Sequence, residues 1–174
     1  MSSLYYLLAS LPMLKADGEM PFSYDTFLGM CRGNIKEDQY RLLETLTVQS
    51  SEGALVSDWA KFYGVLNQEL IYQRKMRLGK PCQVPVERDD GAIRTVTAAM
   101  NEKNPLEAEQ MLLALQFEKL DELVNQHYFD EAALVGYALK LKLLERKTIF
   151  QREAGRAELD RIAEGLQKQI LNME

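Results

Sequence analysis

Few side chains of this sequence could do nucleophilic or metal chemistry: one histidine, His127, and two cysteines, Cys31 and Cys82. A lone histidine at the end of an expected helix is more often a cap, facing the negative end of the helix dipole, than a general base. The cysteines are too few for a disulfide framework or a zinc site. No serine or cysteine lies in a nucleophile-elbow motif, and no glycine-rich loop precedes the Lys-Ser or Lys-Thr pair that binds nucleotide phosphates. The sequence therefore predicts no catalytic residue and no enzyme.

Acidic side chains are concentrated on one expected helix, where a pair of metal ions is the chemistry to consider. A di-metal site in a helical bundle needs a Glu-x-x-His motif on each of two helices, and a single histidine cannot supply both. We interpret these acids as a solvated helix face, and we expect no metal and no cofactor. They are Glu107, Glu109, Glu118, Asp121 and Glu122.

The charge is distributed unevenly along the chain. The 174 residues contain 21 Lys and Arg against 26 Asp and Glu, and this net charge of −5 argues against a freestanding nucleic-acid binder. Residues 101–131 carry eight acids and two bases, whereas residues 69–88 carry five bases and two acids, and residues 139–161 carry seven bases and four acids. The pattern fits either ordinary surface charge that adjacent helices neutralise, or a polarised body that docks between partners of opposite charge.

The elements that must position these residues are helices. Apolar residues recur at helical spacing through most of the chain, and no segment alternates with the period of a strand. Residues 4–11 are apolar nearly all round and fit a buried helix or a buried strand, with helix favoured by the rest of the chain. The sequence thus predicts an all-α protein, an elongated bundle of about six to seven helices. Helices are expected at about 24–32 after the N-cap Ser23, at 36–47, 54–78 and 92–102, at 105–127 after the N-cap Asn104, at 131–150 after the N-cap Asp130, and from 155 to the end.

The helix pair at 105–150 is the clearest of these elements. A connection of about four residues forces two long helices to run antiparallel, with their apolar stripes facing each other. Residues 80–91 contain two prolines and form the longest break in the helical pattern, so we expect a hinge there. The chain is accordingly expected to be a single helical domain, 1–174, or two helical subdomains, 1–79 and 92–174, joined by that hinge.

Charged residues accompany the apolar stripes of two long segments, 63–75 and 137–147. A buried unpaired charge costs several kcal/mol, so we expect either a charge pair that links the two long helices or long side chains that carry their charges out to solvent. A bundle that needed only stability would place Leu or Ala at such positions. We therefore predict that these charges form the polar part of a partner interface. They are Glu69, Arg74, Lys140, Glu145 and Arg146.

The sequence contains no stretch that approaches the roughly 20 apolar residues needed to span a bilayer. The apolar run at 4–14 has no basic segment before it and no small-residue cleavage site after it. We therefore expect a mature protein that starts at Met1, resides in the reducing cytoplasm and does not insert into a membrane.

The chain contains four recognisable short segments: Tyr5-Tyr6-Leu7-Leu8-Ala9-Ser10-Leu11-Pro12, Asn104-Pro105-Leu106-Glu107-Ala108-Glu109, Tyr128-Phe129-Asp130 and Tyr137-Ala138-Leu139-Lys140-Leu141. Together they resemble a small, uncharacterised bacterial protein family. Its members are associated with gene clusters of V-type (vacuolar, archaeal-like) ATPases and look like a short relative of the C-type subunit of the central stalk. The segments 63–75 and 134–147 are also similar to the helices that this central-stalk subunit repeats around its funnel. The resemblance covers essentially the whole chain, in scattered motifs.

This resemblance implies an all-helical, non-catalytic protein that joins the soluble rotor stalk to the membrane ring of a proton- or sodium-pumping V-type ATPase. Its partners would be other V-type ATPase subunits, in the central stalk or the membrane ring, and not nucleic acid. It would be cytoplasmic, or peripheral at the inner membrane through the complex. The chain is much shorter than the central-stalk subunit, so it would supply only part of that body. The alternative is an all-helical assembly chaperone or adaptor that binds a partner peptide in a groove between its two halves.

Overall fold

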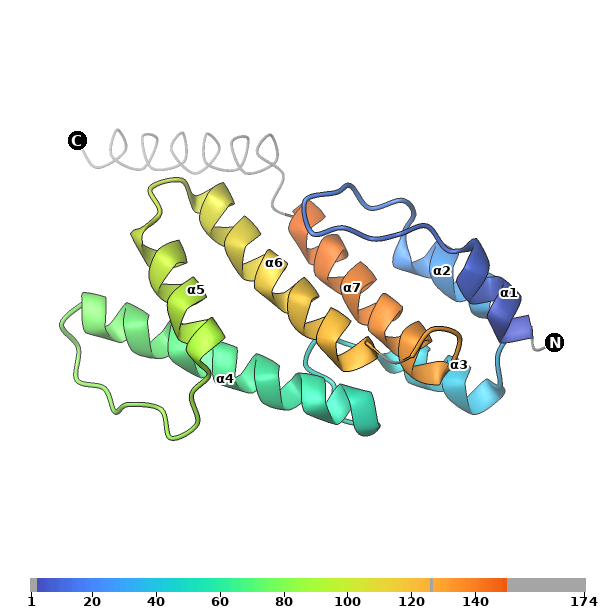
Figure 1. Cartoon of the computed structure of the whole chain (residues 1–174), viewed down its shortest axis with the longest axis horizontal. Helices are drawn as coiled ribbons and strands as arrows, with labels where there is room; N and C mark the ends of the chain where they lie inside the picture. Colours follow the sequence, from blue (N-terminus) through green and yellow to red (C-terminus); the bar gives the residue numbers. More distant parts are fainter. Residues whose placement is uncertain (1–2, 126, 150–174) are drawn as a thin grey trace, which may run out of the picture.

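The computed structural model describes residues 3–125 and 127–149, and within them the chain forms seven α-helices and no strand. The predicted all-α class is therefore confirmed, and Figure 1 shows the elongated bundle that these helices build. The helix expected from residue 155 onward lies outside the described residues. The helices are α1 (Ser3–Ser10), α2 (Tyr24–Cys31), α3 (Glu37–Thr45), α4 (Ala54–Arg77), α5 (Asp90–Asn101), α6 (Pro105–Val124) and α7 (Glu131–Ile149).

The helix ends agree with the capping signals in the sequence. The side chains of Ser23 and Asn104 accept hydrogen bonds from backbone N–H groups of the first turns of α2 and α6, at 3.2 and 3.1 Å. Asp130 does the same for α7, accepting from the N–H of Ala133 at 3.0 Å. Gly33 and Gly79, which follow α2 and α4, have φ angles of 79° and 63°, a left-handed conformation that glycine adopts without a steric penalty. Local chemistry therefore sets where these helices begin and end.

The segment that fitted helix or strand equally well is the helix α1. Its side chain Leu7 is buried, and the ring of Tyr5 packs against the ring of Phe129 with centroids 4.4 Å apart. The burial expected for this segment is wrong, because Leu7 alone is buried among residues 4–10, whereas Tyr5 and Tyr6 are 40% and 58% exposed. The helix is confirmed by the structure, as the composition of the rest of the chain favoured.

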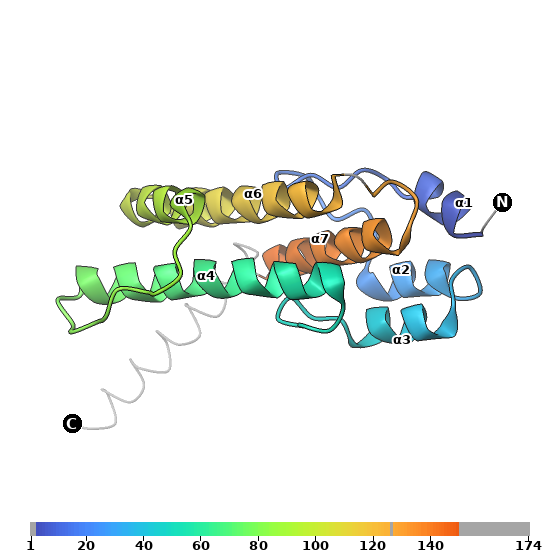
Figure 2. The same ribbon diagram turned by 60° about the horizontal axis from the view of Figure 1, so that its bottom comes forward.

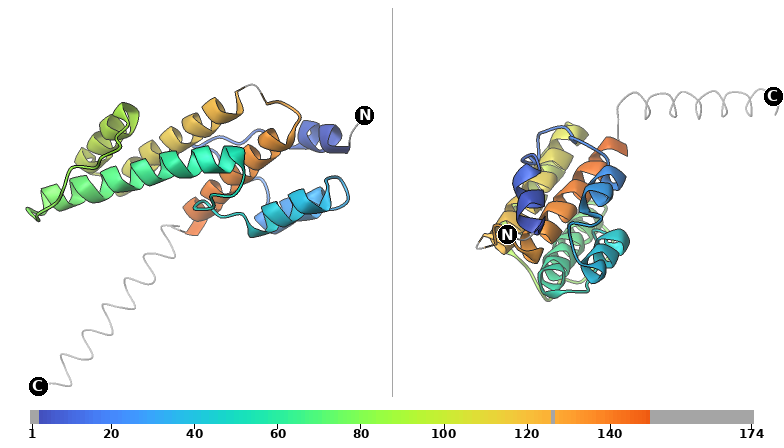
Figure 3. Two further views of the ribbon diagram at one scale, coloured as in Figure 1. Left: turned by 90° about the horizontal axis from the view of Figure 1, so that it is seen from below. Right: turned by 90° about the vertical axis from the view of Figure 1, so that its right-hand side faces the viewer.

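The last described helix, α7, lies at the centre of one half of the molecule. It packs against α2, α3, α4 and α6, and the end-on view in Figure 3 shows these helices gathered around it. Its buried residues point in several directions, which explains why its apolar residues do not form a single narrow stripe. They include Leu134, Val135, Ala138, Leu139, Leu141, Leu143 and Leu144.

The helices α6 and α7 form the predicted antiparallel pair, and they approach each other closely at Gly136. A Cβ atom at Gly136 would overlap a methyl group of Val124, which lies in the last turn of α6. Glycine therefore permits a contact between the two helices that a larger residue would disturb.

The other half of the molecule is built on α4, the longest helix. Figure 2 shows α5 and α6 in a layer over α4, and all three helices pack against one another. Buried residues on both sides of the connection 80–91, among them Trp59, Leu66, Val96 and Leu120, belong to one continuous hydrophobic cluster. The hinge expected at 80–91 would be a motion of the two halves about this connection, and it stays a prediction.

Candidate partner interface

The two predicted interface residues on α4 have opposite environments. Glu69 is only 1% exposed, so its carboxylate faces the interior. Arg74, little more than one turn further along α4, is exposed, and its side chain makes no ion pair or hydrogen bond within the described residues. Of the two, Arg74 is the residue available to a partner.

The three predicted interface residues on α7 make contacts within the protein. Lys140 forms an ion pair with Asp121 of α6. Glu145 accepts a hydrogen bond from Lys142 of the same helix at 3.2 Å. Arg146 is exposed at the end of α7 and donates a hydrogen bond to the hydroxyl of Tyr63.

Within the described residues no charge pair links the two long helices, so this one of the two expected alternatives is wrong. The α4–α7 link is instead the hydrogen bond from Arg146 to Tyr63, at 3.0 Å. Glu69 is paired, as a buried charge must be, but its partner is Arg88 in the connection between α4 and α5. The sequence indicated the buried carboxylate and missed its cation.

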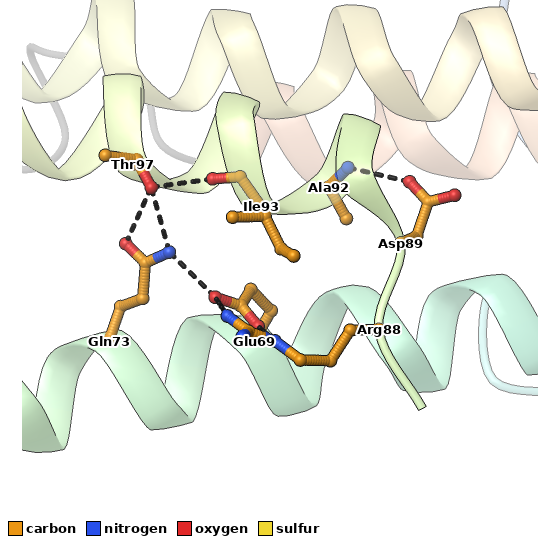
Figure 4. A network of polar contacts seen from close by, with 7 residues as sticks. All are labelled: Glu69, Gln73, Arg88, Asp89, Ala92, Ile93 and Thr97. Carbon is orange, nitrogen blue, oxygen red and sulfur yellow. Dashed lines mark hydrogen bonds and ion pairs between the residues drawn. The ribbon is translucent and has the colours of Figure 1, made fainter. Parts of the chain in front are cut away.

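Arg88 holds Glu69 with a bidentate contact, drawn in Figure 4. Its Nε donates to Oε2 of Glu69 at 3.0 Å, and one terminal nitrogen donates to Oε1 at 2.9 Å. The amide nitrogen of Gln73 donates to the same Oε1 at 2.8 Å and lies 3.0 Å from the hydroxyl of Thr97 on α5. The network thus joins α4, α5 and the connection between them around one buried carboxylate.

The Arg88 hydrogen bonds hold the pKa of Glu69 below its ordinary value, although burial acts in the opposite direction. Glu69 is therefore charged at neutral pH, and the ion pair is closed there. The neighbouring residue, Asp89, caps α5 by accepting a hydrogen bond from the N–H of Ala92 at 2.8 Å. Two consecutive residues thus fasten the end of the connection to two different helices.

An open groove of about 730 Å³ lies between α4 and the connection. The α4 side is formed by Gln68, Ile71, Tyr72 and Lys75, and the other side by residues 81–86. Several of its apolar side chains are exposed, including Ile71 at 53% and Val84 at 57%. The guanidinium of Arg88 lies over the ring of Tyr72, 5.4 Å from its centroid, so the ion pair and the groove share one wall.

Exposed bases occur at the same end of α4, and one of them, Lys75, lines the groove. The side chains of Arg74, Lys75 and Lys80 form no ion pair within the part of the chain that the structure describes. The acid of α4 that lies nearest to them in the sequence, Glu69, is already paired with Arg88. The end of α4 therefore combines exposed apolar side chains with unneutralised positive charge, a combination suited to a partner that carries acids next to apolar residues.

The residues first considered for catalysis occupy structural positions. The ring of His127 contacts the carboxylate of Asp130, which caps α7, so the histidine supports the turn between α6 and α7. Cys31 is buried and Cys82 half-buried in the groove. Within residues 3–125 and 127–149, no cluster of three or more His, Cys, Asp or Glu side chains is placed to hold a metal ion. In the same residues, no helix has both the length and the apolar composition needed to cross a membrane.

Comparison of the chain with protein-family models, with curated proteins and with solved structures gave no match. The segments that carry the resemblance to the ATPase-associated family contain both structural contacts and exposed side chains. Asn104 caps α6, and the hydroxyl of Tyr137 donates to the carbonyl oxygen of Pro12 at 3.1 Å. Asn104 and Tyr137 therefore support the shape of the molecule, whereas Leu106 and Tyr128 of the same segments are 57% and 73% exposed.

Proposed function

We propose that this protein is a non-catalytic helical component of a bacterial V-type ATPase, with a structural or coupling role like that of the C-type subunit of the central stalk. The sequence resemblance suggests the complex, and the elongated all-helical fold suits a body that spans two partners. The observation that carries the proposal is the end of α4. Exposed apolar residues there accompany Arg74, Lys75 and Lys80, bases that form no ion pair within residues 3–125 and 127–149. A solvated helix face would not need the apolar residues.

The partner that fits this surface is a protein segment with apolar side chains flanked by Asp or Glu. Its apolar side chains would fill the groove beside Ile71 and Val84, and its acids would neutralise the bases of α4. The bases also steer association, because complementary charge raises the rate of encounter. In this proposal the protein contacts the stalk or the membrane ring through other subunits, in the cytoplasm or at the inner face of the membrane.

The groove also supports the alternative, an assembly chaperone or adaptor. A chaperone would hold the same kind of segment before the ATPase is complete and release it during assembly. The two roles differ in stoichiometry and lifetime, because a permanent component stays in the finished complex and a chaperone leaves it.

Affinity purification of the tagged full-length chain from its native host tests both roles. Recovery of the whole ATPase in constant stoichiometry supports the permanent component, and recovery of one unassembled ATPase protein supports the chaperone. Purification without any part of the ATPase contradicts both.

Variants of the exposed arginine test the surface itself. Arg74→Glu should weaken capture of the ATPase and lower the melting temperature only slightly. The Arg74 side chain makes no hydrogen bond or ion pair in the described residues, and the substitution costs only the favourable position of a positive charge in the last turn of α4. Arg41→Glu is the matched control, since Arg41 is an arginine on α3 whose exposed side chain makes only a surface contact with Glu37 at 3.5 Å. Equal capture by the two variants would place the interface elsewhere.

A further inference from the structure

The connection between α4 and α5 runs back along α4 for nine residues, 80–88, which we call the strap. Figures 1 and 3 show it turning at the end of α4 and running beside that helix towards α5. At its start, the N–H of Lys80 donates to the carbonyl oxygen of Lys75 at 3.0 Å. At its end, Arg88 contacts Glu69, which lies about one and a half helical turns before Lys75 on α4. The strap therefore runs alongside the last turns of α4 and forms one side of the groove.

Almost nothing else fastens the strap to the body. Within the described residues, positions 81–87 make no hydrogen bond and no ion pair. Their apolar side chains point largely to solvent, with Val86 fully exposed. Backbone groups that have no partner in the protein are satisfied by water, so they add nothing to the hold on α4.

The composition of the strap makes it stiff. Pro81 and Pro85 fix their own φ angles, and each disfavours the helical conformation for the residue before it. A stiff segment moves as a unit, so the position of one end determines the position of the rest. The contact at Arg88 can therefore set the width of the groove over its whole length.

We propose that Arg88 is the positioning residue of the partner groove, because its contact with Glu69 holds the strap 80–88 on α4. The proposal rests on the proposed function only in assigning the groove to a partner; the fastening of the strap is a property of this chain alone. The competing explanation is that the cap at Asp89 and the packing of α5 already hold the strap, with Arg88 serving only to neutralise a buried charge. The two explanations differ in what happens to the groove when Arg88 is removed.

A native thiol reports the state of the groove. Cys82 lies in the strap, lines the groove and is half-buried, whereas Cys31 is 0% exposed in the core. The rate at which N-ethylmaleimide, a neutral reagent, modifies each cysteine of the full-length chain is measured by mass spectrometry of its peptides. The reaction of Cys82 reports the opening of the strap, and protection of Cys31 shows that the protein remains folded.

Arg88→Ala should raise the rate at Cys82 by about tenfold or more, which corresponds to about 1.4 kcal/mol lost from the closed strap. Cys31 should stay protected. Arg88→Lys should give an intermediate rate, because an ammonium group keeps the charge and loses the bidentate geometry. Lys75→Gln controls for a change of charge in the groove, since Lys75 lines it and makes no ion pair with Glu69; its rate should equal that of the wild type.

An unchanged Cys82 rate in folded Arg88→Ala overturns the proposal in favour of the cap and the packing of α5. If Arg88→Ala exposes Cys31, the double variant Glu69→Gln/Arg88→Ala is tested instead, because it leaves no buried unpaired charge. The reaction rates of Cys82 and Cys31 are measured in it and interpreted in the same way. Neither measurement needs a partner. Failure of the strap is thus distinguished from failure of the proposed function, which is read from Arg74→Glu in the purified complex.

Discussion

Arg146, near the end of α7, donates a 3.0 Å hydrogen bond to the hydroxyl of Tyr63 in α4. The two residues are 83 positions apart in the sequence, and their contact joins the two long segments that were expected to share a charge pair. Tyr63 is buried and Arg146 is exposed, so the hydrogen bond lies at the boundary between the core and the surface. Arg146 therefore has a structural role within the protein, independent of any contact with a partner.

Arg146→Ala and Tyr63→Phe should each lower the free energy of unfolding by about 0.5–1.5 kcal/mol, the usual net value of one hydrogen bond. The double variant should lose about as much as one single variant, because both remove the same bond. Chemical denaturation of the wild type and these three variants measures this. Fully additive losses would show that the two side chains act independently.

Substitutions of Arg88 and Glu69 should lower the free energy of unfolding by different amounts. Arg88→Ala strands a buried carboxylate and should lower the free energy of unfolding by up to about 3–5 kcal/mol. Glu69→Gln should cost less, about 1–3 kcal/mol, because the guanidinium left behind is already one-third exposed and can be hydrated. Urea unfolding of the two variants compares the losses, and a larger loss in Glu69→Gln would contradict the structure.

The same pair predicts how stability depends on pH. The pKa of Glu69 is lowered in the folded state by its hydrogen bonds from Arg88, so its contribution to stability is full above the pKa of an unfolded glutamate. That contribution is lost as the pH falls from this unfolded value through the lowered folded one. In Arg88→Ala the largest cause of the lowering is absent, and only the hydrogen bond from Gln73 still opposes the burial that raises the pKa of Glu69. The difference in melting temperature between the wild type and Arg88→Ala should therefore shrink as the pH falls, whereas a constant difference would exclude this linkage.

Gly136 and Gly64 offer a matched pair of substitutions. Gly136→Ala should destabilise the protein by about 1–3 kcal/mol, because the new methyl group meets Val124 at the α6–α7 contact. Val124→Ala in the same chain should recover part of that loss by making room. Gly64→Ala, in the middle of α4, meets nothing within 4 Å and should stabilise the helix by up to about 1 kcal/mol. Thermal melts of these variants test the close approach of α6 and α7 at Gly136. Equal changes in melting temperature for Gly136→Ala and Gly64→Ala would disprove it.

The site was partly readable from the sequence. The charges that accompany the apolar stripe of α4 left two alternatives open, a paired charge or a side chain that carries its charge to solvent. For Glu69 the structure shows the first, a buried and paired carboxylate. Its partner could not be read, because Arg88 is one of five bases in residues 69–88 and nothing in its spacing marks it. The groove was also hidden, since it depends on how the strap turns back along α4. The prolines at 81 and 85 indicated that the helix ends, but they did not indicate the direction in which the chain continues.

The sequence by itself determined the helical class, the capped starts of α2, α6 and α7, and the stops at Gly33 and Gly79. These features depend on residues within a few positions of one another, so local chemistry decides them. Tertiary structure alone decided that residues 3–10 are a helix, that α7 is central, and that Glu69 pairs with Arg88 and Arg146 with Tyr63. Each of these depends on surfaces that meet only after the chain has folded back on itself, because burial and charge pairing are settled by neighbours in space.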